Sequence, residues 1–98
     1  GMKTFSSGEI VFVRFPFTDL KGSKRRPGLV LFDTGDADIV VARITGKSPS
    51  SEFLDPSCVR VHKLSTLRKN LVERKMGRLT EGDFMRVKAA MEELWRTL

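Results

Sequence analysis

The hydrophobic residues of this 98-residue chain change their spacing once, near Thr80, and this change constrains the fold more than any other feature. Before it, short runs rich in valine, isoleucine and phenylalanine are separated by turn residues, a pattern typical of β-strands. Three such runs cover 9–17, 28–33 and 38–44. After it, apolar residues recur every three or four positions, as on one face of a helix. The pattern predicts several short strands followed by one terminal helix.

Turn chemistry separates the predicted strands. A loop over 18–27 ends at Pro27, and the residues 33–36 form a hairpin turn in which Gly35 is free to adopt a positive φ. The segment 45–57 is rich in serine and proline and is predicted to be a long loop.

Two further strands follow that long loop. Residues 58–64 alternate and predict a half-exposed strand, with Val59, Val61 and Lys63 on one side and Cys58, Arg60 and His62 on the other. A fifth and shorter strand is predicted near 71–76.

The terminal helix has a clear start. Thr80 can cap it, with Asp83 three residues later as in a capping box. Its apolar stripe, which we interpret as packing against the core, consists of Phe84, Val87, Met91, Leu94 and Leu98, with Trp95 beside them. The fold class predicted is mainly β (α+β): a small β-barrel closed by a C-terminal amphipathic helix.

Length and composition set the remaining limits. We expect one domain over 3–98, and we interpret Gly1 ahead of Met2 as the remnant of a cleaved tag. No apolar run is long enough to span a membrane and no secretory signal is present, so we expect a cytoplasmic protein. Cys58 is the single cysteine, so an intrachain disulfide is excluded. We expect its side chain to be buried as a small hydrophobic group.

Positive charge is concentrated in two segments. The formal net charge is +6, while 21–26 alone carry +4 and 60–78 carry +6, with acidic residues prevailing elsewhere. Two basic segments in one small domain favour an anionic partner such as a nucleic acid. A solvated face of lysines and arginines explains the same pattern, and the sequence leaves both interpretations open.

Most catalytic constellations are absent. One histidine and one cysteine cannot build a His/Cys metal site, and the acidic residues of 33–38 have the spacing of a turn, so no metal or cofactor is expected. Cleavage of RNA without a metal remains possible because the ribose 2′-hydroxyl is itself the nucleophile and needs only alignment, a proton acceptor and stabilisation of negative charge. Residues suited to these tasks are Arg26, Thr45, Arg60 and His62.

Three segments carry a resemblance to a known family. GEIVFVRFPFTDLKGSKRRPGLVL (8–31), ARITGKS (42–48), and VRVHKL followed by GRL and the helix occur in the order seen in the MazF/PemK family of toxin endoribonucleases, which the chain therefore resembles. The resemblance implies an SH3-like, CcdB/PemK-like barrel that forms a homodimer and is bound by a cognate antitoxin. It also implies metal-independent cleavage of single-stranded RNA.

The resemblance assigns roles residue by residue. The catalytic arginine before proline falls on Arg26 and the catalytic threonine on Thr45, while Arg60 and His62 stand where related toxins have an arginine and an aspartate. His62 could replace that carboxylate as general base or could be a solvated strand residue, and both interpretations stay open. Residues expected to bind the substrate are Lys24, Arg25, Phe17, Lys47 and Lys63.

Two alternatives belong to other functional classes. The chain could be a non-catalytic toxin of the same fold that binds a protein target such as gyrase, or a non-catalytic module that binds nucleic acid.

Overall fold

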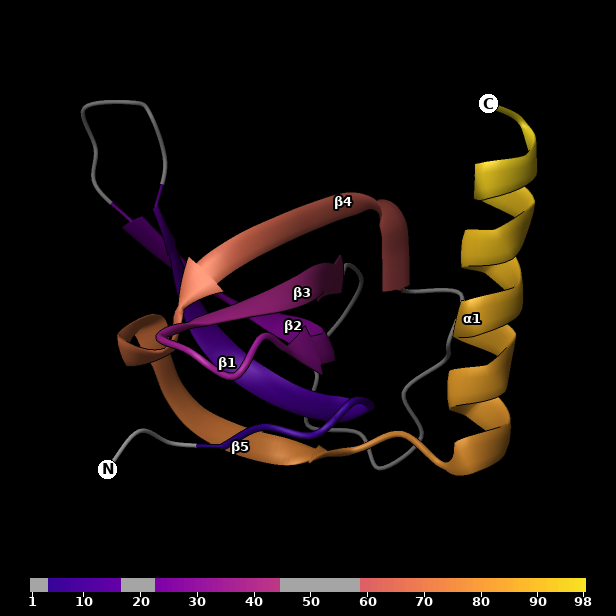
Figure 1. Ribbon diagram of the computed structural model, residues 1–98. Helices are drawn as coiled ribbons and strands as arrows, with labels where there is room; N and C mark the ends of the chain where they lie inside the picture. Colours follow the sequence, from indigo (N-terminus) through magenta and orange to yellow (C-terminus); the bar gives the residue numbers. More distant parts are fainter. Residues whose placement is uncertain (1–3, 17–22, 45–58) are drawn as a thin grey trace.

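In the part of the chain that the structure describes, five antiparallel strands form one curled, barrel-like sheet with the helix α1 at its side (Figure 1). The structure is a computed structural model and describes residues 4–16, 23–44 and 59–98. The strands are β1 (Glu9–Pro16), β2 (Ser23–Asp33), β3 (Asp38–Ile44), β4 (Val59–Arg68) and β5 (Val72–Arg78), in the spatial order β4-β3-β2-β1-β5. A short 3-10 helix, η2 (Lys69–Leu71), joins the two outer strands, and α1 (Glu81–Arg96) follows β5. The predicted fold class is confirmed.

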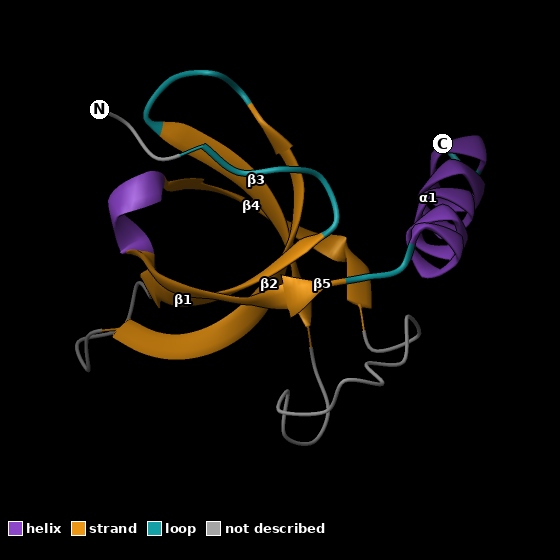
Figure 2. Ribbon diagram, turned by 90° about the horizontal axis from the view of Figure 1, so that it is seen from below, coloured by secondary structure: helices purple, strands orange, loops and turns teal. Residues whose placement is uncertain are grey.

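The curl of the sheet is visible in Figure 2, where the strands surround an interior on the side away from α1. The sheet's two faces carry separate hydrophobic clusters because successive strand residues point to opposite faces. The interior cluster contains Phe5, Val11, Val13, Phe15, Val30, Ile39, Val41, Leu67 and Val72. The helix-side cluster contains Leu29, Leu31, Ala42, Ile44, Val59, Leu79 and Val87. Residues 28–31 of β2 and 39–42 of β3 therefore face a hydrophobic cluster on each side of the sheet, which explains the apolar runs there.

β2 begins five residues earlier than predicted. The segment 23–27 was expected to be loop, but it is the first half of β2 and pairs with β1, from Pro16 opposite Ser23 to Phe12 opposite Pro27. Among the described residues, pairing of β2 with β3 begins only at Gly28. Proline is tolerated in this segment because a strand bonded along one edge can lack one N–H donor.

The β2–β3 turn is held by carboxylates, and Gly35 adopts a φ of +86° as predicted. Asp33 accepts hydrogen bonds from the backbone N–H groups of Phe5 (3.0 Å) and Gly35 (2.7 Å), and Lys69 Nζ lies 2.9 Å from its Oδ1. These contacts lower the pKa of Asp33 to about 2, the Phe5 N–H contributing most. One carboxylate thus ties the N-terminal segment, the turn and η2 together.

The start of α1 is as predicted, but its end is not. Thr80 Oγ1 accepts the backbone N–H of Asp83 at 3.1 Å, and Val87 is buried in the helix-side cluster. The expectation that the whole stripe packs against the core is wrong, because Leu94 is exposed and Trp95 and Leu98 are 75% and 89% exposed. The last turns of α1 lie beside β4, an outer strand of the sheet, where they border an apolar pocket instead of the core.

Candidate functional site

Three arginines lie on one face of the sheet at one of its ends. In the strand pairing, Arg26 is opposite Val13, Gly28 is opposite Arg43, and Arg43 is opposite Arg60. Directly opposed residues, and residues two apart along a strand, share a face of the sheet. Arg26, Arg43 and Arg60, which we call the arginine row, therefore lie on the interior face, the one that carries Val13.

The arginine row is compact. Opposed residues of an antiparallel pair have Cα atoms about 5 Å apart, and two residues along a strand span about 7 Å. The three Cα atoms therefore fall within about 12 Å of one another by this geometry. Arg26 and Arg60 have exposed side chains, and Arg43 is half-buried. This end of the face therefore carries positive charge, and arginine donates in a fork that matches phosphate oxygens.

An aromatic ring supports the middle of the row. The Arg43 guanidinium carbon lies 5.1 Å from the centroid of the Phe15 ring, which is a cation–π distance. Phe15 is buried and closes the interior cluster at this end. A Cβ atom placed on Gly28 would lie 3.6 Å from the tip of the same ring. This is an ordinary van der Waals distance, so Gly28 packs beside the ring that supports Arg43.

A bulge in β4 sets the positions of His62 and Lys63. The pairing with β3 passes from Arg43 opposite Arg60 directly to Ala42 opposite Leu64, so Val61, His62 and Lys63 are extra residues on β4. Bulges of this kind redirect side chains and often occur beside functional sites. The predicted alternation holds for Val59 and Val61 but then fails, because Leu64 rather than Lys63 joins them on the helix side. His62 and Lys63 are exposed and follow Arg60, a member of the arginine row, by two and three positions in the sequence.

Arg25 lies on the opposite face of the sheet from Arg26. It is paired with Arg14 across β1 and β2, and its Nε donates to Glu73 Oε1 of β5 at 2.6 Å. Arg14 Nη2 lies 3.5 Å from the same oxygen. The pKa of Glu73 is lowered, first by the hydrogen bond from Arg25. The substrate-binding role of Arg25 stays a prediction, and the structure gives this residue a carboxylate partner.

Three of the predicted site residues lie outside the described residues: Thr45, Phe17 and Lys47. Cys58 lies outside them as well. The backbone of Lys24 is described, opposite Phe15, but its side chain is not. Thr45 follows Ile44, the last residue of β3, directly in the sequence.

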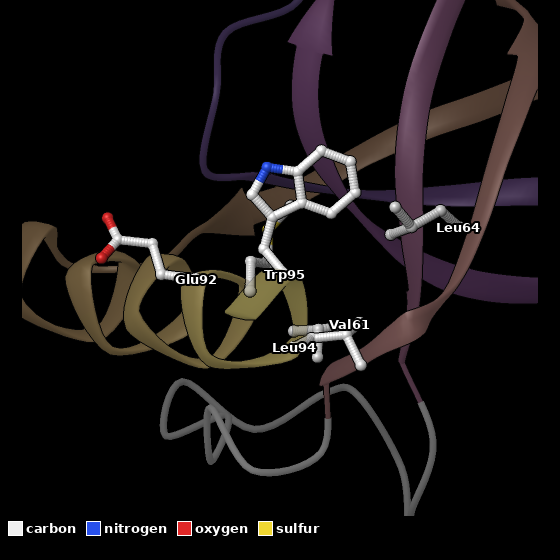
Figure 3. Close-up of a pocket in the computed structure, with 6 residues that line it drawn as sticks. Val61, Leu64, Glu92, Leu94 and Trp95 are labelled. Atoms are coloured by element: carbon white, nitrogen blue, oxygen red, sulfur yellow. The ribbon is translucent and has the colours of Figure 1, made fainter. Parts of the chain in front are cut away.

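A second surface, which sequence analysis missed, is an apolar pocket between α1 and β4. Its volume is about 330 Å³, and Figure 3 shows Trp95 of α1 reaching toward Leu64 of β4 beside it. The pocket is lined by Val61, Leu64, Met91, Glu92, Leu94 and Trp95. The apolar residues at the end of the helical stripe, Leu94 and Trp95, were the sequence signal for this pocket. Sequence analysis assigned them to the core instead.

Within the described part of the chain, no three His, Cys, Asp or Glu side chains are grouped so that they could hold a metal ion. No helix in these residues is both long enough and apolar enough to cross a membrane.

A curled antiparallel sheet with one C-terminal helix and a basic end is the architecture of a class of small toxins. The model of the PemK-like, MazF-like toxins of type II toxin–antitoxin systems matches residues 6–95, and the chain belongs to this family. The predicted family is confirmed. A comparison of the sequence with curated proteins gives no match.

Several solved structures share the fold of this chain. The MazE–MazF crystal structure (form II) from Deinococcus radiodurans is similar with a TM-score of 0.73 and 15% identity, over 99% of this chain and 100% of that one. An endoribonuclease from a mycobacterial species gives 0.67 and 20%, over 94% and 91%. A mycobacterial endoribonuclease in complex with its cognate antitoxin gives 0.64 and 20%, over 89% and 90%. At these identities the likeness concerns the fold.

Proposed function

We propose that this toxin is an endoribonuclease that cleaves single-stranded RNA without a metal ion. The observation that supports the proposal is that Arg26 and Arg60 lie on the same face at one end of the sheet. We propose that both guanidinium groups contact one phosphodiester there. The family and the endoribonucleases among the structural neighbours support the same activity. We further propose that the chain acts in the cytoplasm as a single domain over 3–98.

The proposed reaction uses the nucleophile of the substrate. The ribose 2′-oxygen attacks the adjacent phosphorus and its proton passes to a base, the bond from phosphorus to the 5′-oxygen breaks, and the leaving 5′-oxygen takes up a proton. The products are a 2′,3′-cyclic phosphate and a 5′-hydroxyl. Negative charge grows on the phosphate oxygens in the transition state, and nearby arginines stabilise it.

Each proposed catalytic residue has a task. Arg26 stabilises the developing charge and takes part in proton transfer, Arg60 contributes further positive charge, and Thr45 hydrogen-bonds the phosphate or the 2′-hydroxyl. His62, exposed two residues beyond Arg60 in the β4 bulge, is the proposed general base. The proposed contacts to the rest of the RNA come from Lys24, Arg25, Phe17, Lys47 and Lys63.

We also propose a homodimer and a cognate antitoxin as partners. The exposed Trp95 and Leu98, together with the apolar pocket beside α1, leave apolar surface that binding of a protein could bury. Of the three similar structures described above, one is a MazE–MazF structure and one is an endoribonuclease in complex with its cognate antitoxin.

The test is incubation of the purified protein with a long RNA in EDTA. Wild type should cleave, whereas Arg26→Ala and Thr45→Ala should each lose at least about a hundredfold in rate, the scale for removal of one transition-state donor. Arg86→Ala is the matched control, since it removes the same charge from the exposed side of α1. No cleavage by wild type, or full activity in both variants, would refute the proposal. Inhibition of gyrase or salt-sensitive RNA binding without cleavage would then identify one of the two alternatives.

A further inference from the structure

We propose that Arg14 and Arg25 form a second phosphate-binding site for RNA, which Glu73 occupies in the free protein and from which a backbone phosphate displaces it. The inference rests on the proposed function for the kind of ligand. It adds Arg14, to which neither the resemblance nor the proposed reaction gives a role, and it makes Glu73 a competitor of the RNA.

The first argument is that two arginines converge on one anionic oxygen. Arg14 and Arg25 are directly opposed on β1 and β2, so they share a face of the sheet. Arg25 Nε donates to Glu73 Oε1 at 2.6 Å, and Arg14 Nη2 lies 3.5 Å from the same oxygen. Guanidinium groups donate to carboxylate and phosphate oxygens in similar geometry. The carboxylate therefore marks a position that suits a phosphate oxygen.

The second argument is that Glu73 is held weakly. The side chains of Arg14 and Arg25 are 49% and 56% exposed. Ion pairs at such exposed positions contribute little to stability, because water and salt screen them. Two guanidinium groups also face one carboxylate, so the three side chains together carry a net positive charge. A phosphate can thus replace Glu73 at small cost and meet two donors already in place.

The third argument is the surface around this site. Arg74 of β5 is paired with Phe12 of β1, two residues from Arg14, and so lies on the same face. Its side chain is exposed, and its guanidinium carbon lies 5.4 Å from the centroid of the Phe12 ring. Arginines beside an aromatic ring are common on surfaces that bind single-stranded nucleic acids. The site thus belongs to a wider basic face.

The fourth argument is the relation to Arg26. Arg25 and Arg26 are consecutive on β2, so their side chains leave opposite faces of the sheet. Two arginines directed in this way serve different phosphates of one RNA strand. The second site therefore lengthens the bound segment of RNA and takes no part in the reaction proposed at Arg26.

The test measures binding of a single-stranded RNA oligonucleotide with 2′-O-methyl riboses, which keeps the phosphates but cannot be cleaved by the proposed route. Affinity is measured over a series of salt concentrations for wild type, Arg14→Met, Glu73→Gln and the double variant. Glu73→Gln should bind about fivefold more tightly than wild type, because no carboxylate then competes with the phosphate.

The decisive comparison is the effect of Arg14→Met in the two backgrounds. It should weaken binding about threefold in wild type but about tenfold in Glu73→Gln, where release of the carboxylate no longer offsets the lost phosphate contact. In the Glu73→Gln background the salt slope should also fall by about 0.7, the share of one single-strand phosphate contact. Arg14→Lys should retain the slope.

Two further variants complete the experiment. Arg25→Met should repeat the pattern of Arg14→Met, because both arginines hold the same oxygen of Glu73. Arg86→Met is the matched control, since Arg86 is an exposed arginine of α1, and it should bind as wild type does. Melting temperatures of all these variants should stay close to that of wild type, as expected for exposed side chains.

Four results overturn the inference: equal effects of Arg14→Met in the two backgrounds, an equal loss in Arg86→Met, a clear drop in melting temperature in both Arg14→Met and Arg25→Met, or failure of wild type to bind the oligonucleotide. Failure of the proposed function appears separately, in the EDTA cleavage assay, because binding of the 2′-O-methyl oligonucleotide requires no catalysis.

Discussion

Replacing Val87 with alanine is expected to weaken the docking of α1 on the sheet by about 2 kcal/mol. Val87 is 2% exposed and packs in the helix-side cluster among residues of β2, β3 and β4. The two methyl groups removed contribute roughly 0.8 kcal/mol each through burial, and the cavity left behind raises the loss to about 2–3 kcal/mol. Alanine then restores up to about 0.5 kcal/mol through its higher helix propensity.

The measurement is urea unfolding followed by far-UV circular dichroism at fixed protein concentration, since self-association would couple stability to concentration. Met85→Ala is the matched control, because Met85 is on the same helix but 56% exposed. Its free energy of unfolding should stay within about 0.5 kcal/mol of wild type. A loss below about 0.5 kcal/mol in Val87→Ala would contradict the packing of α1 through this residue.

Three further predictions concern the turn and the basic surface. The pKa of Asp33 is lowered to about 2, chiefly by the hydrogen bond from the backbone N–H of Phe5. The contribution of this carboxylate to stability is therefore complete above about pH 4 and is lost as the pH falls toward 2. Thermal melts from pH 5 to 2 should show a falling melting temperature, and the fall should be smaller in Asp33→Asn. Gly35→Ala should lower the free energy of unfolding by about 1 kcal/mol because alanine is strained at positive φ. Gly77 has equally open surroundings but no positive φ, so Gly77→Ala should leave that free energy unchanged. Urea unfolding measures both. Glu73→Gln should remove the charge that neutralises Arg25 and so strengthen RNA binding. Titration of the protein with a single-stranded RNA oligonucleotide at several salt concentrations should then show a steeper salt dependence.

Each of these can fail in a distinct way. Melting temperatures of wild type that stay constant from pH 4 to 2 would contradict the linkage assigned to Asp33. Equal effects of the two glycine substitutions would show that backbone conformation does not set the cost. Weaker RNA binding by Glu73→Gln would indicate that this carboxylate organises the basic surface instead of neutralising it.

Local signals were enough to define most elements. The strand Asp38–Ile44 was predicted with its observed bounds, and Gly35 and Thr80 occupy the turn and the cap as expected. These features depend on residues within a few positions of each other, which is why a single sequence reveals them. The β2 start was missed because its basic, glycine-preceded residues have loop composition, and only pairing with β1 makes them a strand.

The residues of the candidate site also differ in how far the sequence alone could predict them. Arg26, Arg60 and His62 could be proposed from residue type and resemblance, and they remain proposals for this chain. Nothing in the neighbouring sequence marks Arg43 as a site residue. A single arginine in an apolar strand stands out only when its neighbours across the sheet are known. That it is opposed by Arg60 and supported by Phe15 follows from the registers of three strands.

The sequence by itself determined which segments are strands and which is the helix, the turn chemistry and the positive charge. Each of these depends only on the spacing of nearby residues or on composition. Only the tertiary structure decided that Arg25 and Arg26 face opposite ways and that the end of α1 stays exposed. It also decided that three arginines from separate strands align. The reason is that register and docking depend on which distant residues meet, and hydrophobic burial of the whole sheet selects those partners.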